Sequence, residues 1–279
     1  MAGKEKQKTP EPIELVEAIP EGLGGEEAGA EAAAVGSTYV PALRAGMALE
    51  QPGPSALDMT GIRPPYLSLV HGTSKDLLEK FNQGDLVLSK DFAAARKGEA
   101  MPAIILGIDQ FWKERVTQDQ WNDGRRPRIF RNKEEAREAG LRVDWEGDIG
   151  PDAGPAMDVL LLIRKPKDRE CGLYGVDIGI MDGGNPTEWA ICLMSFDKTG
   201  YRVMANDTFN TIRFKLGKSG TYSALWEFRT ELGAPAKKTG NRPFVVRAKF
   251  TGMLDPMVVA NIRNVMSVPV TAREPGEEG

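Results

Sequence analysis

The chain has 279 residues, of which 41% are hydrophobic and 27% are charged, and its formal net charge is −4. These values are typical of a soluble globular protein with one or two domains. No apolar run approaches the roughly 18–20 residues of a membrane-spanning helix, and no apolar signal region follows the N-terminus, so we expect a cytoplasmic protein.

Cysteine and histidine, which many metal-binding and catalytic sites require, are scarce. Cys171 and Cys192 are too few for a disulfide scaffold or a cysteine-based zinc site. The single histidine, His71, argues against metallohydrolase and Ser-His-Asp schemes, which need an imidazole beside other ligands or a nucleophile. Neither a G-x-x-x-x-G-K-[ST] nor a G-x-G-x-x-G motif occurs. We therefore expect no cofactor and no metal, and an enzyme is the less favoured class.

Charge is distributed unevenly along the chain. Residues 1–60 carry ten acidic and four basic side chains, recurrent prolines and few apolar residues. Such a segment cannot bury enough surface to offset the entropy of ordering, so we predict a disordered acidic tail over 1–60. Residues 271–279 form a second acidic end, predicted to be disordered, whereas 61–270 carry 31 basic and 27 acidic side chains. A mildly basic domain between acidic ends is compatible with binding a polyanion, or with solubility alone.

The folded part is predicted to begin at Ile62–Asp91. The stiff Pro64-Pro65 pair leads into alternating apolar and polar residues, which predict a strand at 66–70. The further elements predicted in the first half are a helical turn at 75–81, a strand at 86–88, a helical or loop segment at 92–99, a buried strand at 101–108 and a short helix at 133–139.

The second half contains one long amphipathic helix. Tyr201, Met204, Phe209, Ile212 and Leu216 fall near helical spacing and predict a helix from about 198 to 216. The other predicted elements are strands at 157–165, 173–181 (irregular), 188–194, 222–228 and 244–250, and a helix or last strand at 257–265. Together they predict an α+β fold, a β-rich single domain over 61–270 with a partly open barrel or OB-like sheet.

Basic and aromatic residues mix in three stretches: Phe111–Arg115, Trp121–Arg131 and Trp226–Arg242. Binding of single-stranded nucleic acid needs basic side chains along the phosphate backbone and aromatic side chains on which nucleobases stack. The residues expected to bind phosphates are Arg125, Arg126, Arg128, Arg131, Lys237, Lys238 and Arg242. The residues expected to stack are Trp112, Trp121 and Phe130.

Two sets of carboxylates keep a metal-dependent nuclease open as an alternative. Asp144, Glu146 and Asp148 form an acidic cluster, but no glycine and glutamate follow at the spacing of a calcium loop. Asp177, Asp182 and Glu188 imitate a nuclease carboxylate set without the Glu-x-Lys that should follow. A solvated loop is the simpler interpretation of the first cluster.

Three features resemble a group of phage and prophage proteins. They are P-P-Y-L-S-L-V-H-G-T-S-K with F-N-Q-G-D-L-V-L, the strand A-M-P-A-I-I-L-G-I, and L-M-S-F-x-K-T-G-Y-R, which opens the helix before a final aromatic strand pair. The resemblance covers roughly 62–110 and 188–250. It implies a replication or recombination accessory protein, a group that includes single-stranded DNA binders, and it assigns no role to any residue.

The sequence thus predicts a sequence-tolerant single-stranded DNA-binding protein of phage or prophage replication or recombination. Its acidic tail would compete for the basic groove or recruit replication or recombination proteins. The alternative from another class is a phage structural or assembly protein that acts through protein contacts. The choice between DNA and RNA and the presence of a homo-oligomer stay open.

Overall fold

The computed structural model describes residues 64–147, 149–235 and 242–267. The predicted tails 1–60 and 271–279 lie outside these residues. The strands are β1 (Leu67–Leu69), β2 (Leu86–Leu88), β3 (Phe92–Ala95), β4 (Met101–Glu114), β5 (Ile129–Phe130), β6 (Ala153–Arg164), β7 (Met181–Asp182), β8 (Asn185–Pro186), β9 (Trp189–Asp197), β10 (Ala224–Leu232) and β11 (Phe244–Met253). The helices are α1 (Lys75–Leu78), α2 (Gln118–Asn122), α3 (Lys133–Glu138), α4 (Lys198–Thr211) and α5 (Pro256–Ser267).

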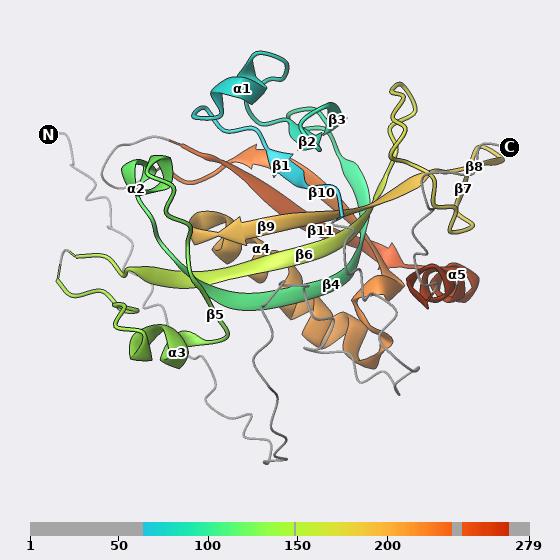
Figure 1. Cartoon of the computed structure of the whole chain (residues 1–279). Helices are drawn as coiled ribbons and strands as arrows, with labels where there is room; N and C mark the ends of the chain where they lie inside the picture. Colours follow the sequence, from blue (N-terminus) through green and yellow to red (C-terminus); the bar gives the residue numbers. More distant parts are fainter. Residues whose placement is uncertain (1–63, 148, 236–241, 268–279) are drawn as a thin grey trace, which may run out of the picture. The chain divides into compact units, whose positions relative to one another are not determined.

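A large antiparallel sheet dominates the fold, in the order β11-β10-β4-β6-β9, with β5 paired to the end of β4 (Figure 1). Its centre is the long β4–β6 pair, which runs from Ala103 opposite Ile163 to Glu114 opposite Ala153 with one register shift between Ile105 and Gly107. Both strands are apolar on two faces, which is typical of strands covered on both sides. Within the described residues no pairing joins β9 to β11, so the sheet does not close into a barrel.

The two faces of the sheet pack into two hydrophobic clusters. One cluster includes Met157, Val159 and Leu161 of β6 and is covered by α4 and the small sheet β1-β2-β3. The other includes Leu160 and Leu162 of β6 and is covered by α5. Alternation along one strand therefore supplies both cores, because successive strand side chains point to opposite faces.

The small sheet connects two strands of the large sheet. On the β9 side, the Leu193 N–H donates to the Pro65 carbonyl at 3.0 Å. On the β10 side, the Gly98 N–H donates to Thr230 Oγ1 at 3.1 Å. The segment at 64–98 thus joins the large sheet at both ends: Tyr66 bridges in parallel to Leu193 at the β9 edge, and Gly98 bonds to β10.

The long helix protects the edge strand β11. Asp207 of α4 accepts a hydrogen bond from the Ala248 N–H at 3.0 Å and pairs with Arg247 at 2.8 Å. An unpaired edge N–H is a template for aggregation, and a helix that covers it removes this risk. α4 ends in a π-helical turn at Ile212–Leu216.

The prediction of mixed helix and strand content, mostly sheet with one long helix, is confirmed. Segment 92–99 contains the strand β3 instead of a helical segment or loop, because pairing of Leu86 with Ala95 overrides the helical preference of alanine. Segment 173–181 is mostly irregular and holds only the start of β7. Of the two options for 257–265 the helix is found, and α2 and β5 were not predicted.

Candidate nucleic-acid interface

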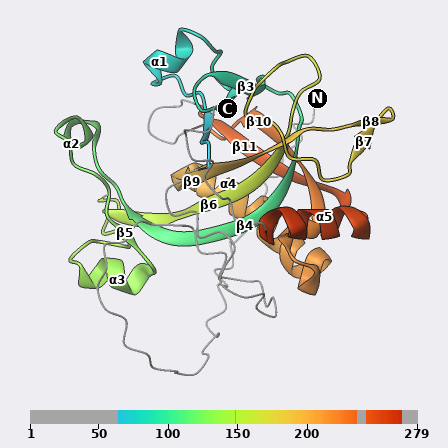
Figure 2. The same ribbon diagram turned by 45° about the vertical axis from the view of Figure 1, so that its right-hand side comes forward.

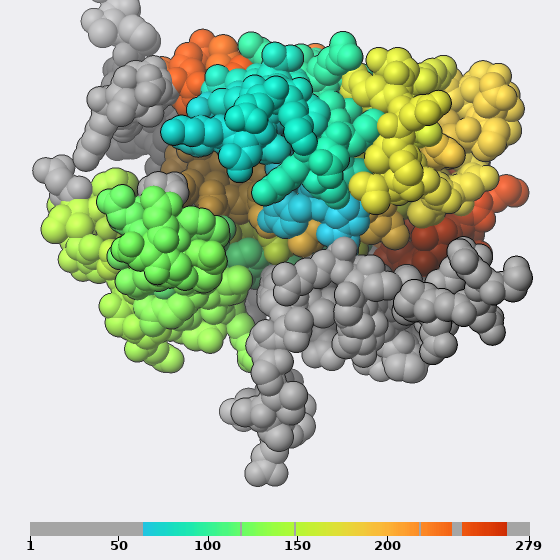
Figure 3. Space-filling model, turned by 45° about the horizontal axis from the view of Figure 1, so that its top comes forward, coloured from blue at the N-terminus to red at the C-terminus, as the bar shows by residue number. Residues whose placement is uncertain are grey.

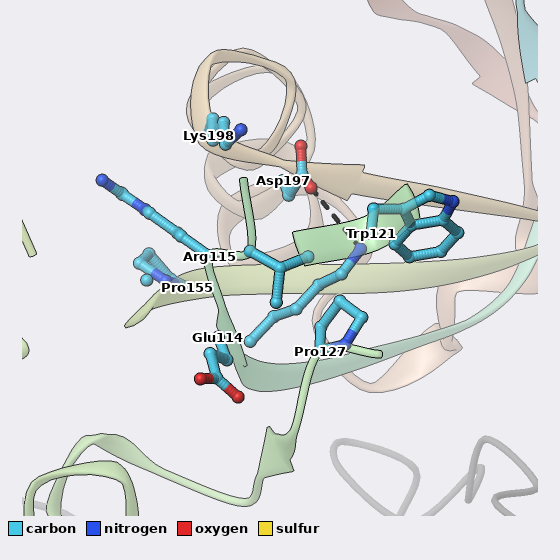
Figure 4. A pocket seen from close by; sticks show the side chains of 10 residues that line it. Glu114, Arg115, Trp121, Pro127, Pro155, Asp197 and Lys198 are labelled. Atoms are coloured by element: carbon cyan, nitrogen blue, oxygen red, sulfur yellow. Dashed lines mark hydrogen bonds and ion pairs between the residues drawn. The ribbon is translucent and has the colours of Figure 1, made fainter. Parts of the chain in front are cut away.

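A pocket of about 180 Å³ lies where the ends of β4 and β9 meet α2 (Figure 4). Figure 2 shows α2 and α3 at the end of the sheet opposite α5. In the space-filling view the surface is hollowed between the green segment that includes α2 and the teal segment that includes α1 (Figure 3). The pocket is lined by Lys113, Glu114, Arg115, Val116, Trp121, Pro127, Gly154, Pro155, Asp197 and Lys198.

Local sequence signals bring Trp121 to this pocket. Thr117 and Gln120 form a capping box in which the Gln120 N–H donates to Thr117 Oγ1 at 3.2 Å and the Thr117 N–H donates to Gln120 Oε1 at 2.9 Å. This pair starts α2 immediately after β4. Gly124, with a φ of 86°, then turns the chain back toward β5. The Thr-x-x-Gln spacing was the sequence signal that could have predicted α2.

Glu114 binds two of the predicted phosphate-binding arginines. Its side chain is only 4% exposed, and it pairs with Arg125 and, at 2.9 Å, with Arg128 Nε. Burial raises the pKa of Glu114, but hydrogen bonds from Arg128 and Arg125 outweigh burial and hold the pKa below its ordinary value. Arg125 and Arg128 therefore hold the loop after α2 in place through Glu114. Their half-exposed side chains also add positive charge around this loop.

Among the described residues that were predicted to bind nucleic acid, Arg126 and Trp121 form a cation–aromatic pair whose ring stays exposed to solvent. The Arg126 guanidinium carbon lies 4.3 Å from the centroid of the Trp121 ring, and its Nη1 donates to the Trp121 carbonyl at 3.3 Å. Trp121 remains 45% exposed. A cation over one face of an indole holds the ring in place while the remaining exposed surface stays available.

The expectation that Phe130 stacks on nucleobases needs correction, whereas that for Trp112 stays a prediction. Phe130 is only 7% exposed and packs with Ala136 and Val143, and Trp112 is half-buried against the same cluster. The two aromatic residues face each other across the β4–β5 pair. They anchor this end of the sheet, because alternation in a short paired strand turns Phe130 inward.

The remaining predicted residues are dispersed. Arg131 is exposed at the start of α3, where its N–H donates to Glu135 Oε2 at 2.7 Å. Arg242 donates through Nε to the Gly233 carbonyl at 3.0 Å and so closes the β10–β11 hairpin. Lys237 and Lys238 lie outside the described residues.

Three further cations line the pocket: Lys113, Arg115 and Lys198. Lys113 Nζ lies 3.5 Å from Asp197 Oδ2. Figure 4 shows Arg115 and Lys198 on the side of the pocket opposite Trp121, with the Glu114 carboxylate directed away from both. The sequence stretch Phe111–Arg115 contains the first two. Lys198 is far from them in the sequence and reaches the pocket because β9, which directly precedes it, pairs with β6.

The backbone of Lys198 is in the left-handed region, with a φ of 48°. This conformation costs a residue with a side chain about 1–2 kcal/mol. Such residues cluster at functional sites, where the surrounding structure holds them in place. Lys198 is therefore a strained basic residue in the wall of the pocket.

A polar row runs across the sheet beside the pocket. Tyr66 donates its hydroxyl hydrogen to Ser195 Oγ, and Ser195 donates to Asp158, which is 7% exposed. Asp109 lies opposite Asp158 in register. Burial raises the pKa of Asp158, with the Asp109 charge acting in the same direction and the Ser195 hydrogen bond against it. This row attaches the residue before β1 to β9.

Four carboxylates of the nuclease alternative are engaged by cations or by backbone: Asp144, Asp177, Asp182 and Glu188. Asp144 pairs with Lys133 at 2.7 Å, and Asp148 lies outside the described residues. A second pocket, of about 560 Å³, collects Asp177, Asp182 and Glu188. There Asp182 pairs with Arg164 and Lys167, Glu188 pairs with Lys165, and Asp177 accepts a hydrogen bond from the Gly179 N–H. No group of three side chains suited to a metal ion occurs in the described part of the chain.

Comparison with models of known protein families, with curated protein sequences and with solved structures found no match to this chain. Among the described residues no helix is both long and apolar enough to cross a membrane.

Proposed function

We propose that the chain binds single-stranded nucleic acid, most naturally DNA, without strong sequence preference, at the pocket beside Trp121. The observation that carries this proposal is the exposed Trp121 ring with Arg126 stacked on it, across a pocket from Arg115 and Lys198. Single strands are bound by a stacking face together with cations that follow the phosphates. The pocket combines both within one small region.

The mechanism is charge neutralisation plus stacking. Arg115 and Lys198 contact phosphates on one side of the pocket, while a nucleobase stacks on the exposed surface of Trp121. Every base has a π-face, so stacking of this kind tolerates many sequences. Glu114 holds Arg125 and Arg128 in the adjacent loop, which keeps the positive charge in a fixed position.

We propose an OB-like fold as well. An open antiparallel sheet that the segment at 64–98 joins at both β9 and β10 supports a partly open barrel of OB-like character. The phage or prophage replication setting, and with it the host cytoplasm, rests on the sequence resemblance around 62–110 and 188–250. Recruitment of replication or recombination proteins by the acidic segment 1–60 is part of the same proposal.

The proposal is tested by fluorescence anisotropy with labelled single strands of mixed sequence at low salt. We expect binding by the full chain, and weaker binding by Arg115→Ala and Lys198→Ala. Arg229→Ala is the matched control, because Arg229 is exposed on β10 and pairs with Glu227 at 2.9 Å. The proposal is wrong if the chain binds no oligonucleotide, or if the control weakens binding as much as the pocket variants do.

A phage structural or assembly protein is the second candidate. Trp145 and Ile149 are both strongly exposed on the loop before β6. Exposed large apolar residues that lie close together mark protein contact sites. Trp145→Ala should then abolish self-association or partner capture while leaving oligonucleotide binding unchanged. Size-exclusion chromatography with light scattering measures the first effect.

A further inference from the structure

We infer that the bound strand continues from the pocket along the exposed face of α4 to a second stacking residue, Phe214. This inference rests on the proposed function and extends its site. Three observations support it. The exposed face of α4 carries basic and amide side chains, Asp207 is already paired, and Phe214 is exposed in the π-helical turn.

The exposed face of α4 starts inside the pocket. Lys198 lines the pocket and is also the first residue of the helix. Positions four residues apart lie on one helix face. The exposed residues that follow Lys198 at spacings of three or four are Arg202, Asn206, Asn210 and Arg213. This stripe, from Lys198 to Arg213, carries positive charge at both ends and neutral amides between them.

Between residues 198 and 217, α4 and its π-helical turn carry no unpaired carboxylate. Asp207 is the one acidic residue between 198 and 217. Its carboxylate accepts the Ala248 N–H at 3.0 Å and pairs with Arg247 at 2.8 Å, at the β11 edge. An acid held in this way has its charge balanced locally, so the stripe remains suited to a polyanion.

The far end of the stripe carries an exposed aromatic ring between two cations. Phe214 is 74% exposed in the π-helical turn Ile212–Leu216. The Arg213 guanidinium carbon lies 5.4 Å from its ring centroid, and Lys215 lies over the Phe250 ring at 5.0 Å. The turn thus presents Arg213, Phe214 and Lys215 together at the surface. This repeats the basic and aromatic composition of the Trp121 site.

The helix sets the distance between the two stacking residues. From Lys198 to Thr211, α4 rises about 20 Å. A strand that reaches both ends must span several nucleotides, within the roughly 4–16 that single-strand sites occupy. Binding should therefore depend on length: a short oligonucleotide uses only the Trp121 pocket, and a longer one also reaches Phe214.

The test compares anisotropy of labelled dT oligonucleotides of about four and about sixteen nucleotides. We expect Phe214→Ala to weaken binding of the long strand about tenfold and to leave the short strand unchanged, with Phe214→Trp restoring the loss. Met257→Ala is the control, because Met257 on α5 is also 74% exposed and lies outside both regions. Trp121→Ala should weaken binding of both lengths.

Two outcomes would overturn the inference, and only the second would also overturn the proposed function. If Phe214→Ala binds both strands as the unchanged chain does, while Trp121→Ala binds both more weakly, the extension along α4 is wrong and the Trp121 site stands. If the unchanged chain binds neither strand, the proposed function fails and the extension fails with it. Since Phe214 is mostly exposed, thermal unfolding of each variant verifies that the fold is retained.

Discussion

The guanidinium carbon of Arg126 lies 4.3 Å from the centroid of the Trp121 ring, on a loop fixed at the pocket edge. Base–aromatic stacking is worth roughly 1–3 kcal/mol. Trp121→Ala should therefore weaken oligonucleotide binding by about 5- to 150-fold, whereas Trp121→Phe retains part of the stacking and loses less. Anisotropy titrations at one salt concentration measure both. Equal binding by Trp121→Ala and the unchanged chain would exclude stacking at this residue.

Glu114 should contribute to stability through its two arginines. Glu114→Gln removes a buried charge that pairs with Arg125 and Arg128, and we expect a loss of about 1–3 kcal/mol at pH 7 in thermal unfolding. The pKa of Glu114 is lowered, so its contribution is present above the ordinary value of 4.5 and is lost as the pH falls through the folded-state value. The difference between the two proteins should therefore shrink in acid. A difference that persists unchanged would contradict the pairing.

The Asp158 carboxylate should lower the stability of the fold at pH 7, whereas the Glu114 carboxylate should raise it. Burial raises its pKa above the ordinary value of 3.8, so the stability linked to its proton is complete below that value and is lost as the pH rises through the folded-state pKa. At pH 7 the buried charge is a cost. Asp158→Asn keeps an acceptor for Ser195 and should raise stability by about 1 kcal/mol, which is roughly 2–4 °C in Tm.

The matched control for Asp158 is Asp152→Asn. The hydrogen bond from Arg142 lowers the pKa of Asp152, so this variant should be less stable than the unchanged chain at pH 7 and should converge with it in acid. Thermal unfolding across pH separates the two carboxylates. If Asp158→Asn were also destabilising at pH 7, the buried charge at Asp158 would not be a cost.

Lys198 combines strain and charge, and two substitutions separate them. Lys198→Ala removes the charge and keeps a side chain at a φ of 48°, whereas Lys198→Gly removes both. The glycine variant should be more stable than the alanine variant by about 1 kcal/mol, and both should bind oligonucleotide equally weakly. Calorimetry and anisotropy on the pair test this. Equal stability would show that the left-handed conformation stores no strain.

Most of the fold could be predicted from residue patterns. The long helix followed from Met204 and Leu216 at helical spacing, and the central strands followed from the apolar runs around Ile105 and Leu161. Segment 92–99 could not be predicted, because its strand exists only through pairing with β2. The strands β4 and β6 are longer than predicted, because Asp109 interrupts the apolar pattern of β4, and Gly154 and Pro155 precede the apolar run of β6, while pairing continues.

The candidate site could be predicted only in part. Trp121 and Arg126 were identified from composition and lie together at the surface. Phe130 was identified by the same criterion and is buried, because composition does not indicate which face of a paired strand points inward. Lys198 and Phe214 depend on long-range pairing of β9 and on a π-helical turn, which leave no local composition signal.

The salt dependence of oligonucleotide binding tests the central claim most directly. Each phosphate neutralised in a single strand adds about −0.7 to the slope of log K against log salt concentration. With Arg115 and Lys198 in contact with phosphates, we expect a slope of about −1.4 or steeper, and Lys198→Ala should reduce its magnitude by about 0.7. No binding at low salt, or binding indifferent to salt, would contradict the account.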